Sequence, residues 1–400
     1  MTGQSSSKLY DVAVVGSGPA GAMSALSLAK EGVRVVVIEK ENLPRRKTCG
    51  GGVVRRALGL LPVDVTGAIE RECYVAEVNL VSAQLHFTSK REEPMVSMTM
   101  RENFDFLLVS AAKEAGAEVR ERCLVQDVSI HADKVEVVTN KGSLSSRFVV
   151  AADGAKSIVA KKAGWKETRN LAPALECEVT VNDESLERLS RSVRFDFGLI
   201  PSGYAWTFPK KDHLSMGVLS MRPGPIKLNR MFEQYLKLIN LDGVVSIKRR
   251  GSLIPVSPRK DGFVKNRVLL TGDAAGLVDP VVGEGITSAV MSGMIAAKAL
   301  LDAAFDKEKV KPYYESALSM KILQDLRLGR VLAKLIYDYP GLLRRLLALY
   351  GQEFTEAVTD VVTGEKTYKR MMSTPRNYLQ LFRIWYATRK EKYAHEEPPG

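Results

Sequence analysis

The chain has 400 residues, of which 45% are hydrophobic and 26% charged, and this is the composition of an ordinary globular protein. Its four cysteines form no CxxC pair, so neither a disulfide framework nor a metal site is expected, and no Lys/Arg tract with interleaved aromatics favours a nucleic acid partner. The net charge of +12 leaves two interpretations open: a charged surface that keeps the protein soluble, or an anionic partner such as a phosphorylated lipid, a membrane surface or an acidic electron carrier.

Residues 9–38 predict a strand–helix–strand unit. The β-branched run 12–15 is typical of a buried strand, the Ala- and Leu-rich run 22–30 of a helix, and residues 33–38 of a second strand. Because a helix connects them, the two strands are expected to be parallel.

A GxGxxG turn joins the first of these strands to the helix. Gly16 permits the tight turn, Gly18 lets the backbone approach a pyrophosphate, and Gly21 allows the helix to pack closely on the strand. Glu39 ends the second strand, where a carboxylate accepts hydrogen bonds from ribose hydroxyls. These residues predict dinucleotide binding but do not distinguish FAD from NAD.

The middle and the end of the chain continue the alternation of strands and helices. Residues 86–100 and 118–140 alternate apolar and polar side chains, as half-buried strands do, and residues 104–115 between them have helical spacing. Residues 172–220 predict an antiparallel sheet, and the pattern is helical from about residue 309.

Two further turns carry candidate cofactor contacts. Gly272 and Asp273 follow an apolar strand and open a helix, where the aspartate can bind a ribityl hydroxyl and the helix dipole can face the flavin pyrimidine. Asp153 and Gly154 form a strand-end turn of the same kind. No second GxGxxG follows another strand, so a dedicated nicotinamide domain is not expected.

The GxGxxG, DG and GD motifs occur in the order found in flavoproteins of the p-hydroxybenzoate hydroxylase fold, and residues 9–305 resemble that group. The resemblance implies FAD as cofactor and an α/β fold (α+β overall), in which a Rossmann-like FAD-binding domain carries a second, antiparallel-sheet substrate domain and a helical C-terminal region. It also implies that Arg101 lies near the FAD phosphates, although a solvated arginine at a helix start is the alternative. The expected cofactor-binding residues are Gly16, Gly18, Pro19, Ala20, Gly21, Glu39, Lys40, Cys49, Gly50, Arg101, Val125, Asp153, Gly154, Gly272, Asp273, Gly285 and Ile286.

Two local features narrow the family. A cysteine precedes three glycines at residues 49–52, and consecutive glycines let the backbone crowd against a ligand. Later in the chain, three aromatic residues alternate along one strand face and could wall an elongated apolar pocket. They are Tyr204, Trp206 and Phe208. From the residues alone, core packing for this aromatic row and an inert thiol for Cys49 stay open as alternatives.

The CGGG and YAWTFP segments resemble the signatures of the geranylgeranyl reductase family, and the chain is most similar to its archaeal and bacterial digeranylgeranylglycerophospholipid reductase-like branch. The resemblance implies an FAD-dependent oxidoreductase acting on CH–CH groups, which saturates C=C bonds of geranylgeranyl chains in an isoprenoid lipid precursor. The implied partners are a geranylgeranyl-bearing lipid or pyrophosphate and an electron donor, either ferredoxin or NAD(P)H. The main alternative is an FAD-dependent aromatic hydroxylase on the same fold; a flavin or isoprenoid carrier without enzymatic activity is the second.

An isolated alkene has no carbonyl to take up charge, so its reduction needs a proton at one carbon as a hydride reaches the other. A thiol is mostly protonated at neutral pH, so Cys49, or a water beside it, is the predicted proton donor, with Gly50 and Gly51 shaping the catalytic site. Tyr204 and Trp206 could stabilise positive charge at the more substituted carbon through cation–π attraction.

The predicted domain division follows from these motifs. Residues 9–170 and 250–305 form the FAD-binding domain, with residues 41–100 as an insertion in it. Residues 171–249 form the antiparallel-sheet substrate domain, and residues 306–400 the C-terminal helical region.

The expected location is the cytoplasm, because the chain starts without a signal peptide and has no run of about 18 apolar residues. Peripheral contact with the inner face of the cell membrane is an open alternative. The amphipathic, basic segment 340–350 is the candidate for that contact, and packing against the rest of the protein is the other interpretation. Arg55 and Arg56 are candidates for binding the lipid headgroup.

Overall fold

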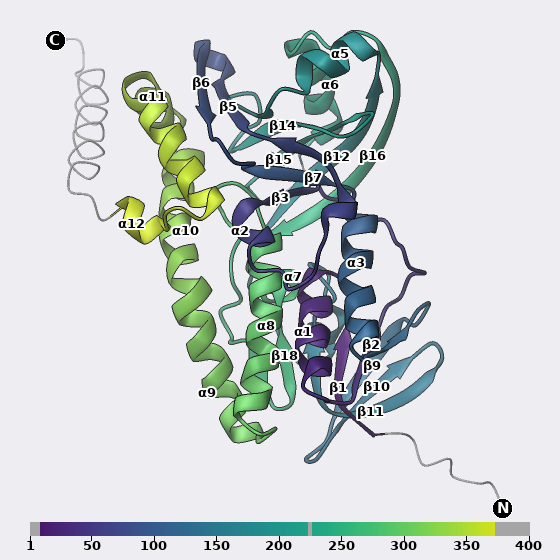
Figure 1. The fold of residues 1–400 in the computed structure, drawn as a ribbon. Helices are drawn as coiled ribbons and strands as arrows, with labels where there is room; N and C mark the ends of the chain where they lie inside the picture. The colour runs from purple at the N-terminus through teal and green to yellow at the C-terminus, as the bar shows by residue number, and fades with distance from the viewer. Residues whose placement is uncertain (1–8, 223–225, 373–400) are drawn as a thin grey trace, which may run out of the picture.

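The computed structural model describes residues 9–222 and 226–372. Figure 1 shows an α/β unit at the bottom, a strongly curved sheet at the top, and a column of C-terminal helices along one side of both. Three sheets are found among the described residues.

The first sheet contains the predicted dinucleotide unit. Its strands are β1 (Leu9–Val15), β2 (Val35–Ile38), β8 (Glu118–Arg120), β9 (Val125–Ile130), β10 (Val135–Thr139), β11 (Gly142–Ala151), β17 (Val264–Lys265) and β18 (Val268–Leu270). They run in the order β17-β18-β11-β1-β2-β8, with β10 beside β11 and β9 beside β10. The strands β18, β11, β1, β2 and β8 pair in parallel, which confirms the expected arrangement of β1 and β2.

Three helices pack together on this sheet: α1 (Pro19–Lys30), α3 (Arg101–Glu114) and α8 (Ile286–Asp302). Helix α1 begins at Pro19, three residues before the predicted start, because proline presets the helical φ and has no N–H to satisfy in the first turn. The small residues of α8 allow it to lie close to α1: a Cβ added at Gly293 would be 2.2 Å from the carbonyl oxygen of Ala20. Short segments complete this part: α4 (Ile158–Lys162) and α7 (Gly272–Ala275).

The second sheet forms the upper part of the molecule. Its strands are β5 (Val75–Leu80), β6 (Leu85–Lys90), β12 (Leu171–Val181), β13 (Val193–Phe197), β14 (Gly203–Pro209), β15 (Leu214–Ser220) and β16 (Val244–Pro255). Their order is β16-β12-β15-β14-β13-β5-β6. One face is covered by α5 (Asp183–Leu189) and α6 (Leu228–Leu238), which bury an apolar cluster with it.

This sheet differs from the predicted allocation of strands in two ways. Strands β5 and β6 lie in the stretch 41–100 that was assigned to the FAD-binding domain, but β5 pairs in parallel with β13, so the sheet is not wholly antiparallel. Strand β16 runs across the predicted boundary at residues 249–250. Both differences have the same cause: strand patterns show which face is buried, whereas partner choice depends on long-range packing. The division into domains itself stays a prediction.

A small third sheet lies between the other two. It consists of β3 (Gly52–Val54), β4 (Ile69–Cys73) and β7 (Val96–Thr99), in the order β3-β7-β4. Strand β3 directly follows the cysteine–glycine segment and leads into the short helix α2 (Arg55–Leu58). A single 3-10 turn, Thr66–Ala68, precedes β4, and another, Val81–Ala83, joins β5 to β6 of the second sheet. The third sheet therefore fixes the end of the cysteine segment between the two larger units.

The C-terminal region is helical as far as it is described. It contains α9 (Lys307–Leu318), a π-helical turn (Ser319–Leu323), α10 (Gln324–Asp338), α11 (Pro340–Thr363) and α12 (Tyr368–Met372), and residues 373–400 of the predicted helical region lie outside the described residues. In the amphipathic segment 340–350 the leucines at 342, 343, 346 and 347 are buried. This face therefore packs against the rest of the protein, which was the alternative to membrane contact for this segment. Of the helices in residues 9–222 and 226–372, none combines the length and apolar character of a membrane-spanning segment.

Candidate active site

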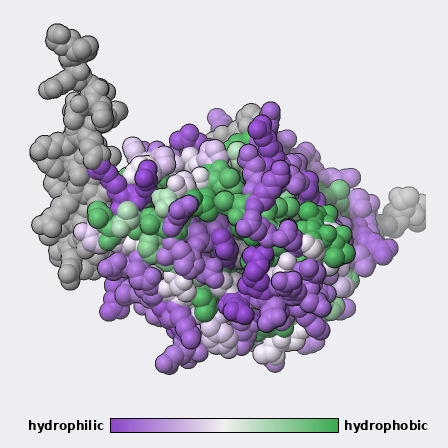
Figure 2. Space-filling view, turned by 90° about the horizontal axis from the view of Figure 1, so that it is seen from above, coloured by the Kyte–Doolittle hydropathy of each residue, from purple (hydrophilic) through white to green (hydrophobic). Residues whose placement is uncertain are grey.

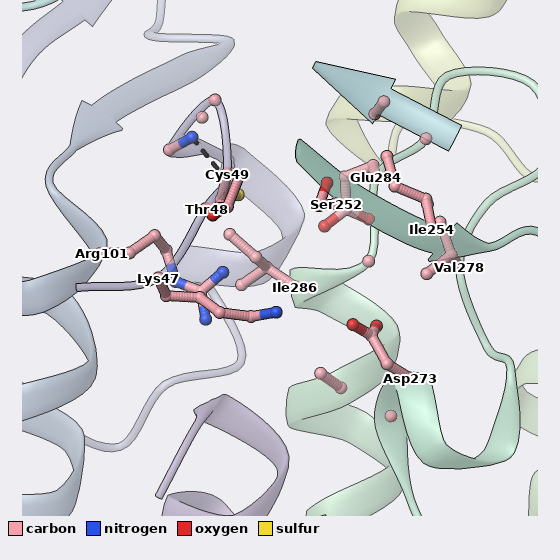
Figure 3. Close-up of a pocket in the computed structure, with 18 of the residues that line it drawn as sticks. Lys47, Thr48, Cys49, Arg101, Ser252, Ile254, Asp273, Val278, Glu284 and Ile286 are labelled. Atoms are coloured by element: carbon pink, nitrogen blue, oxygen red, sulfur yellow. Dashed lines mark hydrogen bonds between the residues drawn. The ribbon is translucent and has the colours of Figure 1, made fainter. Parts of the chain in front are cut away.

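A cavity of about 810 Å³ connects the first sheet to the second and reaches α11. Its size is that of a cofactor or ligand pocket. Figure 3 shows two sides of it: Lys47, Cys49 and Arg101 on one side, and Asp273, Val278 and Ile254 on the other. Residues from the GxGxxG turn, the cysteine segment, the aromatic row and α11 therefore share one space.

The GxGxxG turn opens the dinucleotide end of this cavity. Gly16 has φ +99°, and a Cβ there would be 2.4 Å from the carbonyl oxygen of Ala152, so a side chain does not fit. A Cβ at Gly18 would instead meet only a guanidinium nitrogen of Arg45, at 3.6 Å, so the backbone of this residue is bare on the cavity side. Gly21 does not line the cavity; its Cα faces the carbonyl of Gly16, which is the close packing predicted for it.

Glu39 lies at the end of β2 and is held by several donors. Its carboxylate accepts hydrogen bonds from the Ser17 hydroxyl (2.6 Å), the Glu41 N–H (3.0 Å) and the Arg45 guanidinium (3.0 Å). Burial opposes ionisation, but Arg45 and these hydrogen bonds outweigh it and hold the pKa of Glu39 below its usual value. Glu39 is therefore an oriented, charged acceptor at the cavity wall.

The two aspartates of the DG and GD turns differ in their surroundings. Asp153 accepts hydrogen bonds from the Ser157 hydroxyl (2.6 Å) and the Val159 N–H (3.0 Å), so it also fixes the start of α4, and burial raises its pKa. A Cβ at Gly154 would meet nothing within 4 Å, so its backbone is open toward the cavity. The Asp273 carboxylate lines the cavity, and its backbone carbonyl accepts from Arg169. Together with Gly18, these bare backbone positions fit an elongated dinucleotide.

The cysteine segment crosses the middle of the cavity. The N–H of Gly51 donates to the Cys49 sulfur at 3.4 Å, the interaction drawn as a dashed line in Figure 3. Arg101 is buried beside Cys49 and forms a bidentate ion pair with Asp105 (2.8 and 3.0 Å). Burial opposes its charge, yet Asp105 and Cys49 hold the pKa of Arg101 above its usual value. Arg101 is thus a fixed cation between the cysteine segment and the dinucleotide end.

The aromatic row packs directly on the cysteine segment. A Cβ at Gly50 would be 2.9 Å from the Phe208 ring and 3.3 Å from the indole nitrogen of Trp206. Trp206 in turn covers Gly217, where a Cβ would be 2.3 Å from its ring. The Tyr204 hydroxyl donates to the carbonyl of Val282 at 2.5 Å, which ties the row to the loop before α8. Two signatures about 150 residues apart thus form one wall of the cavity.

Several cavity residues were not anticipated from the sequence. Phe195 and Phe197 on β13 extend the aromatic wall, with ring centroids 5.7 and 5.6 Å from that of Tyr204. Their alternation along a strand was a usable signal. Helix α11 closes the far end with apolar side chains, and no local signal in the sequence indicated this. These side chains are Leu343, Leu347, Phe354, Val358 and Val362.

Glu176, also unanticipated, is a buried carboxyl on the cavity face of β12. It pairs across the sheet with Gly217, which pairs with Trp206, so the three positions share one face. Burial and the neighbouring Glu178 raise the pKa of Glu176 to about 7.

The raised pKa gives a prediction for stability. Since the folded pKa exceeds the unfolded one, the contribution of Glu176 to stability is fully present below pH 4.5 and is lost as pH rises through about 7. Glu176→Gln is expected to raise the free energy of unfolding by about 2 kcal/mol at about pH 8 and to change it little at about pH 4.5. Urea unfolding at several pH values measures this, and a difference that does not vary with pH would contradict it.

The structure brings together nearly all of the sequence-predicted cofactor residues. All except Gly21 line the cavity, including Lys40, Val125 and Ile286. The candidate headgroup arginines do not act as free cations: Arg56 pairs with Glu284 at 3.3 Å, and Arg55 with Glu93 and Glu365. Because glutamates neutralise both charges, the structure does not support Arg55 and Arg56 as an anion-binding site.

Comparisons with known proteins agree with this geometry. A family model described as FAD binding domain matches residues 9–309. A digeranylgeranylglycerophospholipid reductase of Methanopyrus kandleri is 30% identical over 318 residues, which cover 74% of this chain and 81% of that protein.

Two solved structures show the shared fold. A geranylgeranyl bacteriochlorophyll reductase-like protein of Thermoplasma acidophilum superposes with a TM-score of 0.74 at 24% identity, covering 94% of this chain and 96% of the other. A mutant of the halogenase PltM, in complex with FAD, has a TM-score of 0.66 at 18% identity, covering 82% of this chain and 76% of the other. From the matched family model and the reductase relative, the chain belongs to the geranylgeranyl reductase family of FAD-binding proteins.

Proposed function

We propose that this protein is an FAD-dependent reductase that saturates C=C bonds of geranylgeranyl chains in an isoprenoid lipid precursor. The observation that carries the proposal is the continuity of the cavity: it runs from the GxGxxG turn, past Cys49, along the aromatic row, to the apolar side chains of α11. A flavin and a long prenyl chain could thus occupy adjacent parts of one space.

The residues at each part have distinct roles in this proposal. Gly18 and Gly154 would admit the dinucleotide backbone, and Glu39 would accept from its ribose. Bound FAD, once reduced, supplies a hydride. Cys49 would donate the proton that an isolated alkene requires, and the row of Tyr204, Trp206 and Phe208 would hold the chain against it.

Hydroxylases and halogenases on this fold are the competing candidates, since a shared fold does not determine the reaction. The apolar extension under α11 favours the reductase, because a small aromatic ring would leave it unfilled. The net charge of +12 favours fast association with an acidic electron donor such as ferredoxin.

Peripheral membrane contact is part of the proposal, because a geranylgeranyl lipid resides in a bilayer. Figure 2 shows apolar residues forming a band across the end of the molecule seen from above. Tyr339 and Leu349 are 52% and 64% exposed near the exposed Arg344, so this part of the C-terminal helices offers apolar and basic groups together. Co-sedimentation with anionic but not neutral vesicles checks this contact.

The test of the function uses the purified protein without oxygen. The flavin is reduced chemically, digeranylgeranylglyceryl phosphate or geranylgeranyl pyrophosphate is added, and the lipid is analysed by mass spectrometry. A gain of about two mass units per reduced bond, together with flavin reoxidation, is the expected result. A flavin spectrum with unchanged lipid, or a product that requires oxygen, would overturn the reductase in favour of the hydroxylase class.

A further inference from the structure

Lys210 continues the aromatic row but carries a charge. It follows β14 two residues after Phe208, and it is 1% exposed. Its ammonium donates to the carbonyl of Thr99 at 2.7 Å. The cost of burial lowers the pKa of Lys210 to about 8. A buried lysine needs a reason to be there, because burial of an ammonium is unfavourable.

The ammonium of Lys210 packs against the cysteine segment. A Cβ at Gly51 would be 2.4 Å from the Lys210 nitrogen and 2.1 Å from the Thr99 carbonyl oxygen, so only glycine leaves room for this lysine. The N–H of the same Gly51 donates to the Cys49 sulfur. Lys210 and Cys49 therefore both contact Gly51, and Lys210 interacts electrostatically with Cys49.

The other charged and titratable groups around this pair are Glu70, Arg71 and Cys73 on β4, Glu176 on β12, and Arg101 on α3. Arg101 cannot exchange a proton near neutral pH, because a guanidinium keeps its charge. Burial raises the pKa of the Cys73 thiol to about 11, so this thiol does not release its proton readily either. Lys210, whose pKa burial lowers to about 8, can therefore gain and lose a proton near neutral pH, and so can Glu176, whose pKa burial raises to about 7.

We propose that Lys210 returns a proton to Cys49 after each alkene reduction, so that the thiol is ready for the next turnover; this rests on the proposed function. In each turnover the S–H bond of Cys49 breaks and a C–H bond forms at one alkene carbon, while the reduced flavin provides the hydride for the other carbon. An N–H bond of Lys210 then breaks and the S–H bond re-forms. The neutral amine finally takes up a proton from solvent, which restores the ammonium.

The experiment compares the first turnover with later ones in the FAD-loaded protein, without oxygen and with excess dithionite to reduce the flavin again between turnovers. Lys210→Met removes the ammonium that would donate the proton. Lys210→Arg keeps a positive charge but does not release a proton near neutral pH. Both variants are expected to keep the first-turnover rate of flavin reoxidation by geranylgeranyl pyrophosphate within about threefold, and to lose about tenfold in steady-state rate. Lys211→Met, at the exposed neighbouring lysine, should change neither rate.

Two results would overturn the inference. Wild-type steady-state turnover in Lys210→Arg would mean that only the charge matters. An equal loss in the first and later turnovers of both variants would mean that Lys210 merely holds the cysteine segment in place, and the flavin spectrum shows whether the variants still bind FAD.

A second measurement does not depend on the substrate. The rate of Cys49 alkylation by iodoacetamide is followed by mass spectrometry from about pH 6 to about pH 10, with Cys49→Ser as the blank. Lys210→Met removes the cation that packs beside the cysteine segment and is therefore expected to slow the alkylation of Cys49, and an unchanged profile would overturn the coupling of the two residues. If the wild type reduces no prenyl lipid, the proposed function fails, and the alkylation profile still decides whether Lys210 acts on Cys49.

Discussion

Replacing Cys49 by serine is expected to lower the rate of alkene reduction about a hundredfold while FAD stays bound, because a general acid contributes about 10²–10⁴-fold and a hydroxyl is a much weaker acid than a thiol. Cys49 lies in the cavity between Arg101 and the aromatic row, and its sulfur accepts a long contact from the Gly51 N–H (3.4 Å). Serine fits the same space, so the change removes acidity rather than structure. Anaerobic stopped-flow measurement of flavin reoxidation by the prenyl lipid gives the rate.

The matched control for this variant is Cys177→Ala. Cys177 is fully buried on β12 and belongs to the apolar cluster that α5 and α6 cover, away from the cavity. Its loss should lower stability slightly and leave the rate per bound FAD unchanged. A wild-type rate in Cys49→Ser would remove Cys49 as proton donor and leave a cavity water as the source.

Enlarging Leu347 to tryptophan is expected to weaken the binding of a geranylgeranyl chain about a hundredfold, since each excluded CH₂ group forfeits about 0.8 kcal/mol of apolar burial and an isoprene unit contains several carbons. Leu347 is 1% exposed and lines the far end of the cavity. A shorter prenyl substrate, which does not reach α11, should keep most of its affinity. The ratio of KM values for geranylgeranyl and farnesyl pyrophosphate is the measurement.

Ala348→Trp provides the control on the same helix, because Ala348 is exposed and does not line the cavity. Tryptophan at 347 also overfills a packed site, which costs about 1–3 kcal/mol. FAD content and thermal unfolding are therefore recorded for both variants. Equal losses for long and short substrates in Leu347→Trp would show that the α11 end of the cavity is not where the chain extends.

The halogenase neighbours show why the site, and not the fold, separates the candidate functions. They share most of the architecture at 18% identity, so the FAD-binding part is common to several reactions. In this chain the second sheet and α11 make close contacts: Gly50 against Phe208, Trp206 over Gly217, and Phe87 of β6 against Gly351, where a Cβ would be 2.0 Å from the ring. These contacts close an apolar chamber beside the dinucleotide site.

The sequence by itself determined the parts of this protein that depend on local backbone geometry. The turn at Gly16 needs a positive φ, β1 ends in an apolar run, β2 is a continuous β-branched run, and Pro19 marks the helix start, so the first unit follows from residues adjacent in the chain. The motif order and the two signature segments then indicated FAD and the family. Burial of the aromatic row on one strand face was likewise readable from its period of two.

Only the tertiary structure decided which distant segments meet. Periodicity shows that a strand has a buried face but not which strand lies beside it, so β5 and β6 joined the second sheet against expectation. The contact of Gly50 with Phe208, the place of Lys210 behind Gly51, and the closure of the cavity by α11 each join residues more than 100 positions apart. Such contacts are fixed by side-chain packing across the whole core, where shape and volume must match, and no local pattern encodes that match.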